Sequence, residues 1–306
     1  MTLAVLGVGG VGGLLAGALD RAGEKVIVVA RESTADLICK HGLRVSSVRL
    51  GEFTAHPRAL TELTEPVQTL VVATKATTLS QALERIRQPP ELVLPLLNGL
   101  DHLQLLRERF GRTVLAGSIR VEADRPQPGV VTHTSPFLRI DMASSEPALA
   151  MSARALAQKL SDAGIQAQVL DSEPQVMWGK LVRLNALACT TSAFEKLLGE
   201  IRDTPELNDA LVAVIEEGCA VAGAEGAPID PAVAVKELTD AHATLGSSMQ
   251  RDIAAGRAPE LDAIPGAVLR VAARHGIRCP ITERLTAMIA ARIGVSVPAL
   301  TGPAPV

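Results

Sequence analysis

The chain of 306 residues contains no tyrosine, and aromatic residues make up only 2% of it. Without tyrosine, the protein cannot belong to the reductases that use this residue as their general acid, such as the short-chain dehydrogenases. Its four cysteines form no Cys-x-x-Cys pair and have no histidine at the spacing of a metal site; they are Cys39, Cys189, Cys219 and Cys279. We therefore expect reduced, mostly buried thiols and no bound metal.

Long apolar runs and an excess of positive charge are also missing. Hydrophobic residues make up 47% of the chain, yet no run is long enough to cross a bilayer, and the N-terminus lacks the layout of a signal peptide. The formal net charge is −3 and the basic residues are scattered, which argues against a surface for nucleic acid. These features predict a cytoplasmic globular protein whose partners include neither a membrane nor nucleic acid.

The first half of the chain alternates between short apolar strands and helical segments, a pattern typical of β-α-β units and a parallel sheet. Strands are predicted at 2–6, 25–31, 69–74 and 92–97, followed by strands at 130–133 and 137–140 for which an antiparallel arrangement is open. After a polar break at 171–174, helical periodicity dominates over 175–199, 206–224, 231–255, 262–275 and 281–293. We predict an α/β fold: a Rossmann-type, doubly wound sheet in residues 1–170, then an all-helical domain in residues 171–306.

A glycine-rich turn follows the first strand. Gly7, Gly9 and Gly12 match the G-x-G-x-x-G pattern, whose glycines permit a tight turn, admit a pyrophosphate to the backbone and let the next helix pack closely. The pyrophosphate would lie at the N-terminus of that helix, where free N–H groups favour anions. Because the pattern lies between a strand and a helix, it predicts a dinucleotide site, with these cofactor contacts: Gly7, Val8, Gly9, Gly10, Val11 and Gly12.

The residue at the end of the second strand indicates which dinucleotide binds. Enzymes that use NAD usually have an acidic residue there, whereas an arginine accommodates the 2′-phosphate of NADP. Here the strand ends in Ala30-Arg31, and a guanidinium can hold a phosphate through paired, charge-assisted hydrogen bonds. Lys75, after the strand at 69–74, could add a second positive charge. The sequence predicts NADP(H), the alternative being that Arg31 is an ordinary solvated side chain.

Reduction of a ketone requires a proton donor or a fixed positive charge for the developing oxyanion. Lys180 lies early in an apolar helical segment, where burial would lower the pKa of a lysine toward the working range. Lysines also readily keep their ammonium group in water while their stem is buried, so this position alone is modest evidence. An imidazole-based mechanism of the lactate dehydrogenase type is disfavoured, because His133, His242 and His275 have no evident companion Asp and Arg.

Further short motifs extend along the whole chain. They are Gly7–Gly13, Lys75, Leu97-Asn98-Gly99-Leu100, Trp178-x-Lys180-Leu181, Ser247-Ser248-Met249-Gln250-x-Asp252, Glu260-Leu261-Asp262 and Arg274-His275-Gly276-Ile277-x-x-Pro280. In this order and spacing they resemble the ketopantoate reductase (2-dehydropantoate 2-reductase) family, from residue 1 to about residue 293. The resemblance implies NADPH-dependent reduction of a 2-oxo acid to a 2-hydroxy acid, ketopantoate to pantoate in pantothenate biosynthesis, and suggests a homodimer.

The resemblance also implies a role for each matching residue. Lys180 would be the general acid that delivers a proton to the keto oxygen, and Glu260 would orient the lysine or the cofactor while helping to keep Lys180 protonated. Asn98 would bridge the nicotinamide ribose and the substrate, and Ser248 would bind the substrate carboxylate. The backbone near Ala123, which follows Glu122, would touch the cofactor. Simpler interpretations stay open, since Asn98-Gly99 is a common turn and Ser248 could only cap a helix.

The chain departs from the family on the segment after Lys180. Members that reduce ketopantoate typically carry asparagines one and two turns beyond the lysine, where this sequence has Leu184 and Ala188. Asn185, five residues after Lys180, lies on another face of a regular helix, unless a one-residue bulge near Arg183 brings it back. Since a pocket that selects a substrate hydroxyl needs polar partners for it, the apolar residues favour a less polar 2-oxo acid.

Two other functions remain open. A β-hydroxyacid-type dehydrogenase has a similar layout, although the segments 247–252 and 260–262 favour the ketopantoate reductase group. A non-catalytic protein that binds or senses NADPH is a third option, and the presence of both Lys180 and Glu260 argues against it.

Overall fold

The computed structural model describes residues 2–300, which divide into two compact units. The first unit ends at Val176 and excludes residues 98–101, and the second contains residues 98–101 together with the chain from Met177 onward. Asn98 thus belongs to the helical unit although it closely follows a strand of the first unit. In the described part of the chain, no helix is long and apolar enough to span a membrane.

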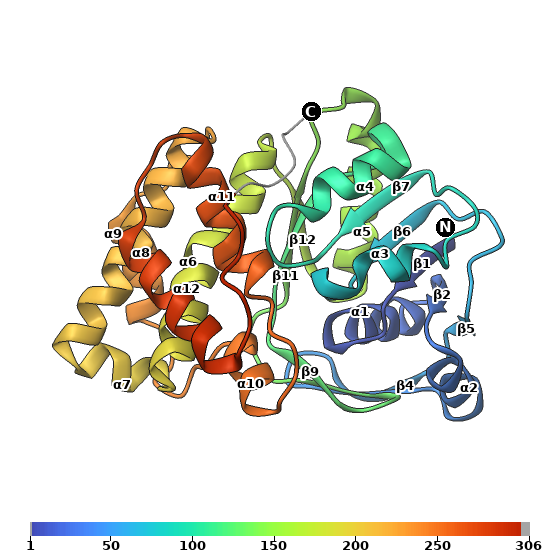
Figure 1. Ribbon diagram of the computed structural model, residues 1–306. Coiled ribbons are helices and arrows are strands. Elements are labelled where there is room, and N and C mark those ends of the chain that lie inside the picture. The colour runs from blue at the N-terminus through green and yellow to red at the C-terminus, as the bar shows by residue number, and fades with distance from the viewer. Residues whose placement is uncertain (1, 301–306) are drawn as a thin grey trace. The chain divides into compact units, whose positions relative to one another are not determined.

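The first unit is built on a five-stranded parallel sheet in the order β5–β2–β1–β6–β7 (Figure 1). The strands are β1 (Thr2–Leu6), β2 (Lys25–Val29), β5 (Arg58–Leu60), β6 (Thr69–Val72) and β7 (Leu92–Pro95). Alternate residues of β1 enter two different cores: Leu3 and Val5 pack in one, and Ala4 and Leu6 in the other. Both faces of the sheet are therefore covered, which is why its strands are continuous apolar runs.

Helices cover these two faces and confirm the predicted doubly wound arrangement. Buried residues of α1 (Gly10–Arg21), α2 (Glu32–His41) and α5 (Ala150–Asp162) belong to the first core. Buried residues of α3 (Leu79–Leu83) and α4 (His102–Phe110) belong to the second. Short 3-10 helices η1 (Ala76–Thr78), η2 (Gly111–Thr113) and η3 (Pro147–Leu149) complete the unit.

Two smaller sheets contain most of the strands that the sequence pattern missed. One has the order β4–β3–β10–β9 and the other β12–β11–β8. Their members are β3 (Leu43–Ser47), β4 (Gly51–Ala55), β8 (Ala116–Arg120), β9 (Ala123–Gln127), β10 (Val130–His133), β11 (Arg139–Ala143) and β12 (Gln166–Val169). The two later strands that were expected, β10 and β11, each have one parallel and one antiparallel neighbour. Among the missed strands, β4 and β9 are largely exposed and β12 is half-buried, so they lack the apolar pattern that marks a strand.

The second unit contains helices and no strand among its described residues, as predicted. Its elements are α6 (Glu173–Phe194, which begins in the first unit), α7 (Leu198–Asp203), α8 (Pro205–Ala224), α9 (Pro231–Thr239), α10 (Ser248–Ala254), the π-helix η4 (Asp262–Gly266), α11 (Ala267–Arg274) and α12 (Pro280–Ile293). Pro205, Pro231 and Pro280 each lie in the first turn of a helix, where the missing N–H costs nothing.

Two predicted helices of this unit were wrong in extent. The segment 175–199 is interrupted at Glu195, which has a positive φ of 56°, because the carbonyls of Ser192 and Ala193 bond to Arg292 and end α6. The segment 231–255 is two helices, since α9 ends at Thr239 and α10 begins after Ser247, whose hydroxyl accepts the Gln250 N–H.

The turn between β1 and α1 has the geometry of a dinucleotide-binding loop. Gly7 has a φ of +95°, which side chains rarely adopt. A Cβ at Gly12 would lie 2.0 Å from the Gly7 carbonyl oxygen, so the helix packs directly on the turn. A Cβ at Gly9 would meet no atom of the described chain within 4 Å, so the backbone there faces open space. The three glycines meet the three requirements of the pattern.

The Gly9→Ala variant should keep the fold and lose affinity for the dinucleotide. Its methyl group would enter the open space above the loop, where it obstructs a pyrophosphate and no protein atom. We expect a thermal midpoint within about 2 °C of the wild type and a Kd for NADPH, measured by fluorescence titration, at least about tenfold higher.

Two further variants serve as controls for this test. Gly12→Ala should destabilise the protein by about 1–3 kcal/mol, because the new methyl group collides with the Gly7 carbonyl. Gly223→Ala also places its Cβ in open space, on α8, and should leave the affinity unchanged without lowering stability, because alanine favours a helix more than glycine does. An unchanged Kd in Gly9→Ala would contradict the role of the loop.

Candidate active site

Several groups adjoin the glycine loop within the first unit. A Cβ at Gly10 would lie 2.4 Å from the carbonyl oxygen of Ala123, so the predicted cofactor contact at Ala123 does border the loop. Thr74 also borders it, because its methyl group would be 2.8 Å from a Cβ at Gly7. Within residues 2–300 the buried Thr74 hydroxyl has no hydrogen-bond partner. An orphaned polar atom of this kind is usually satisfied by water or a ligand, so the loop fits a bound dinucleotide.

The two predicted cationic ligands follow the carboxyl ends of β2 and β6, the two strands that flank β1. Arg31 is exposed and forms the N-cap position of α2, directly after β2 and Ala30. Lys75 is exposed and precedes η1, after β6. Ligands of open α/β sheets bind at these strand ends, and a helix N-terminus adds its own attraction for a phosphate. Their positions suit the role that the sequence suggests, and that role stays a prediction.

Lys180, Asn98 and Glu260 meet in the second unit. The Lys180 ammonium donates a hydrogen bond of 2.8 Å to Asn98 Oδ1, and Asn98 Nδ2 donates one of 2.8 Å to Glu260 Oε2. Lys180 and Asn98 are half-buried, and Glu260 is only 7% exposed. The sequence identified all three residues as candidates, but it did not show that Asn98 is the link between the other two.

The chemistry of the three groups fixes which way the Asn98 amide faces. An ammonium can only donate and an ionised carboxylate can only accept, whereas an amide has one end of each kind. The amide oxygen therefore points to Lys180 and the amide nitrogen to Glu260. The Asn98 amide thus connects a positive ammonium group to a buried carboxylate through two charge-assisted hydrogen bonds, which are stronger than neutral ones.

The segment that carries Glu260 continues into an unusual helical turn. Pro265 has no N–H and would clash with the carbonyl of Leu261, four residues earlier, in a regular helix. The chain widens instead: Gly266 donates to the Leu261 carbonyl (3.1 Å), which is the i to i−5 bond of the π-helix η4. Single π turns of this kind are frequent at functional sites.

Asn98 is held against this turn by its neighbour Gly99. Gly99 has a φ of +84°, and a Cβ there would lie 2.0 Å from the Ala263 carbonyl oxygen. The interpretation of Asn98-Gly99 as a mere common turn is therefore insufficient, since the glycine is also required by a close backbone contact.

Ser248 is exposed at the first residue of α10. The helix cap is its neighbour Ser247, which accepts hydrogen bonds from the Gln250 N–H (3.0 Å) and from the Thr191 hydroxyl of α6 (2.8 Å). The interpretation of Ser248 as a cap is thus wrong, and its role toward a substrate carboxylate stays a prediction.

The apolar positions after Lys180 differ in their environment. Leu184 is partly buried and packs at the margin of the helical core, whereas Ala188 is fully buried within it. Helix α6 is regular through this region, so no bulge returns Asn185 to the face of Lys180. Asn185 is instead fully buried, and its Oδ1 accepts the Cys189 thiol at 3.4 Å. Of the two substituted positions, Leu184 is the one that can border a substrate.

The cysteines and His133 lie outside the group formed by Lys180, Asn98 and Glu260. Burial raises the pKa of Cys189 and Cys279 to about 12 and that of Cys219 to about 11, so these thiols stay protonated. His133 contacts the hydroxyls of Ser47 (2.7 Å) and Ser135 (3.1 Å), and its burial lowers its pKa. Cys39 is exposed. Residues 2–300 contain no group of three or more metal-ligand side chains.

Comparisons with known proteins identify the family of the chain. The family model "Ketopantoate reductase PanE/ApbA" matches residues 3–145, and "Ketopantoate reductase PanE/ApbA C terminal" matches residues 174–293. The "Uncharacterized oxidoreductase YkpB" of Bacillus subtilis (strain 168) is 29% identical over 297 residues, covering 94% of this chain and 97% of the relative.

Solved structures share the fold over nearly the whole chain. The 2-dehydropantoate 2-reductase from Geobacter metallireducens GS-15 has a TM-score of 0.89 at 25% identity, covering 95% of this chain and 100% of the other. D-mandelate dehydrogenase, solved with NADH and anilino(oxo)acetate, has a TM-score of 0.86 at 22% identity, covering 96% and 99%. Because the two family models together match most of its length, the chain belongs to the ketopantoate reductase PanE/ApbA family, whose members are oxidoreductases acting on CH–OH and C=O groups.

Proposed function

We propose that the protein reduces a 2-oxo acid to the corresponding 2-hydroxy acid with NADPH, and that Lys180 is the general acid. The observation that carries the proposal is the hydrogen-bonded chain from Lys180 through Asn98 to Glu260. When bound, the reduced nicotinamide supplies the hydride that adds to the carbonyl carbon. The glycine loop, Arg31 and Lys75 would hold the dinucleotide.

The chain's own residues account for the proton. As the keto oxygen gains negative charge, the Lys180 ammonium transfers a proton to it, so that the C=O group becomes CH–OH and the lysine becomes a neutral amine. Glu260, acting through the Asn98 amide, favours the charged form of the lysine and so promotes its reprotonation from solvent. Ser248 would receive the substrate carboxylate.

Replacing Lys180 by alanine should abolish turnover and spare cofactor binding. A positioned general acid contributes about 10²- to 10⁴-fold to a reaction rate, so we expect kcat to fall by about that factor in steady-state assays. The Kd for NADPH, from fluorescence titration, should change little. Lys236→Ala is the control, since Lys236 on α9 is exposed and paired with Asp240. Full activity in Lys180→Ala would disprove the role of this lysine.

A wild-type protein that binds NADPH and reduces no 2-oxo acid would instead support a non-catalytic, NADPH-binding function. A preference for 3-hydroxy acids in the oxidative direction would support the β-hydroxyacid dehydrogenase alternative.

The preference for NADPH should depend on Arg31. Its exposed position at the start of α2 suits contact with a 2′-phosphate, which NADH lacks. In Arg31→Ala, KM for NADPH should rise at least about tenfold, while KM for NADH stays near its wild-type value. Arg154→Ala, which removes an exposed arginine on α5, is the matched control. Equal losses with both cofactors would contradict 2′-phosphate recognition.

A less polar 2-oxo acid is a second candidate substrate, favoured by the partly buried Leu184 one turn after Lys180. If Leu184 borders the substrate, Leu184→Asn should raise kcat/KM for ketopantoate, relative to 2-oxoisovalerate, by about tenfold or more, because it provides a partner for the hydroxyl. Leu184→Ala enlarges the same position without a polar group and should not produce this change. A wild-type enzyme that already prefers ketopantoate clearly would argue against the apolar pocket.

A further inference from the structure

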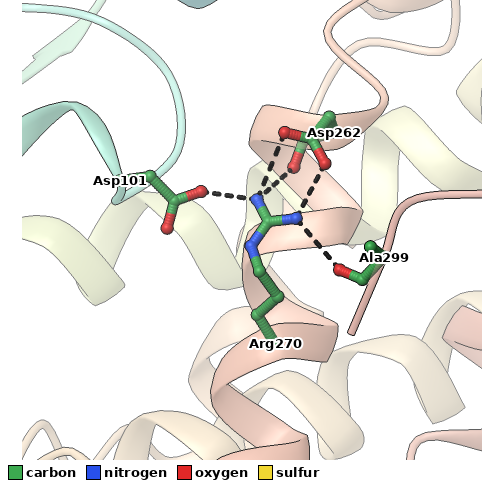
Figure 2. A network of polar contacts seen from close by, with 4 residues as sticks. All are labelled: Asp101, Asp262, Arg270 and Ala299. Carbon is green, nitrogen blue, oxygen red and sulfur yellow. Dashed lines mark hydrogen bonds and ion pairs between the residues drawn. The ribbon is translucent and has the colours of Figure 1, made fainter. Parts of the chain in front are cut away.

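Arg270, on α11, is a buried cation that binds three separate segments of the helical unit, at Asp101, Asp262 and Ala299 (Figure 2). One guanidinium nitrogen donates to Asp101 Oδ2 (2.5 Å) and to the Asp262 carbonyl (2.9 Å). The other donates to Asp262 Oδ1 (2.7 Å) and to the Ala299 carbonyl (3.4 Å). The Arg270 side chain is 8% exposed, whereas those of Asp101 and Asp262 are 51% and 71% exposed.

The guanidinium is suited to hold two segments at once. Its planar fork offers five N–H donors in fixed directions, which a lysine cannot do. Burial by itself lowers the pKa of Arg270, but hydrogen bonds to Asp262 and Asp101 outweigh burial and raise this pKa above its usual value. Arg270 therefore stays charged, and the acceptors on Asp101 and Asp262 fix the position of its guanidinium.

The two carboxylates lie close in sequence to the partners of Lys180. Asp101 ends the four-residue segment 98–101 that begins with Asn98. Asp262 follows Glu260 by two residues and opens the π-helix η4. The same two segments touch at Gly99 and Ala263, where a Cβ on the glycine would be 2.0 Å from the carbonyl oxygen. Arg270 thus binds both segments close to Asn98 and Glu260, the two residues that bond to each other.

We propose that Arg270 is a positioning residue. It holds Asn98 and Glu260 at hydrogen-bonding distance from each other and thereby orients the Lys180 ammonium. The inference rests on the proposed function in one respect, namely that the Lys180 proton is the one transferred. Arg270 touches neither Lys180 nor Asn98 in the contacts above and acts through the backbone of segments 98–101 and 260–262.

Loss of Arg270 should therefore affect the proton donor more than cofactor binding. A misplacement of about 1 Å in a reacting group can lower a rate by about 10²-fold. In Arg270→Met we expect kcat to fall by about 10- to 100-fold while KM for NADPH stays within about threefold of the wild type. Asp101→Ala removes one of the two anchors from an exposed position and should give a smaller loss of the same kind.

A second readout tests the position of Lys180 without substrate. Pulsed acetylation with acetic anhydride at fixed pH, followed by peptide mass spectrometry, reports how accessible and how tightly held the Lys180 amine is. Acetylation of Lys180 should be faster in Arg270→Met and in Asp101→Ala than in the wild type, and Arg270→Lys should recover part of the protection. Exposed Lys236 provides an internal reference within each sample.

Arg292→Met is the matched control for loss of a structural arginine. Arg292 also lies in the helical unit and donates to the carbonyls of Ser192 (2.5 Å) and Ala193 (2.9 Å), not to segments 98–101 or 260–262. This variant should lose thermal stability and leave Lys180 acetylation at the wild-type rate. If Arg270→Met fails to fold, Asp101→Ala and Arg270→Lys carry the test.

The outcomes separate this inference from the proposed function. Faster acetylation of Lys180 in the Arg270 and Asp101 variants supports positioning even if the wild type reduces no 2-oxo acid. The absence of that reduction would contradict only the proposed function. Unchanged acetylation and unchanged kcat in folded Arg270→Met and Asp101→Ala proteins, with an active wild type, would overturn the positioning role alone.

Discussion

The candidate site depends on one amide that joins an ammonium group to a buried carboxylate. Asn98 accepts from the Lys180 ammonium and donates to Glu260, each at 2.8 Å. A carboxylate as buried as Glu260 is costly unless it is hydrogen-bonded and balanced by charge. The amide meets the first need and connects the carboxylate to the charge of the lysine. Neither an apolar nor a purely accepting side chain at position 98 could serve both partners.

The backbone around this amide is shaped by a glycine and a proline. Pro265 prevents a regular helical turn after Glu260 and produces the π-helix, since its nitrogen cannot donate. Gly99 lies against the Ala263 carbonyl of that π-helix, so the segment with Asn98 rests on the segment that follows Glu260. Backbone packing of this kind limits where the two polar side chains can lie.

The two units carry different candidate groups of the proposed reaction. The first unit carries the glycine loop, where the open backbone at Gly9 and the close contact of Gly12 with Gly7 suit a pyrophosphate. The second carries Lys180, Asn98 and Glu260. Family membership indicates the type of reaction rather than the substrate.

The sequence alone determined the features that depend on neighbouring residues: the strand, glycine turn and helix at the N-terminus, the proline-led helices, and the candidates Lys180 and Glu260. The sequence did not predict exposed strands such as β9 or the break of α6 at Glu195, because partners distant in the chain decide them. Only the tertiary structure showed that Asn98 links Lys180, 82 positions away, to Glu260, 162 positions away, and that Arg270 reaches Asp101 across 169 positions. Local backbone preferences reach a few residues along the chain, whereas such contacts exist only once packing has brought the segments together.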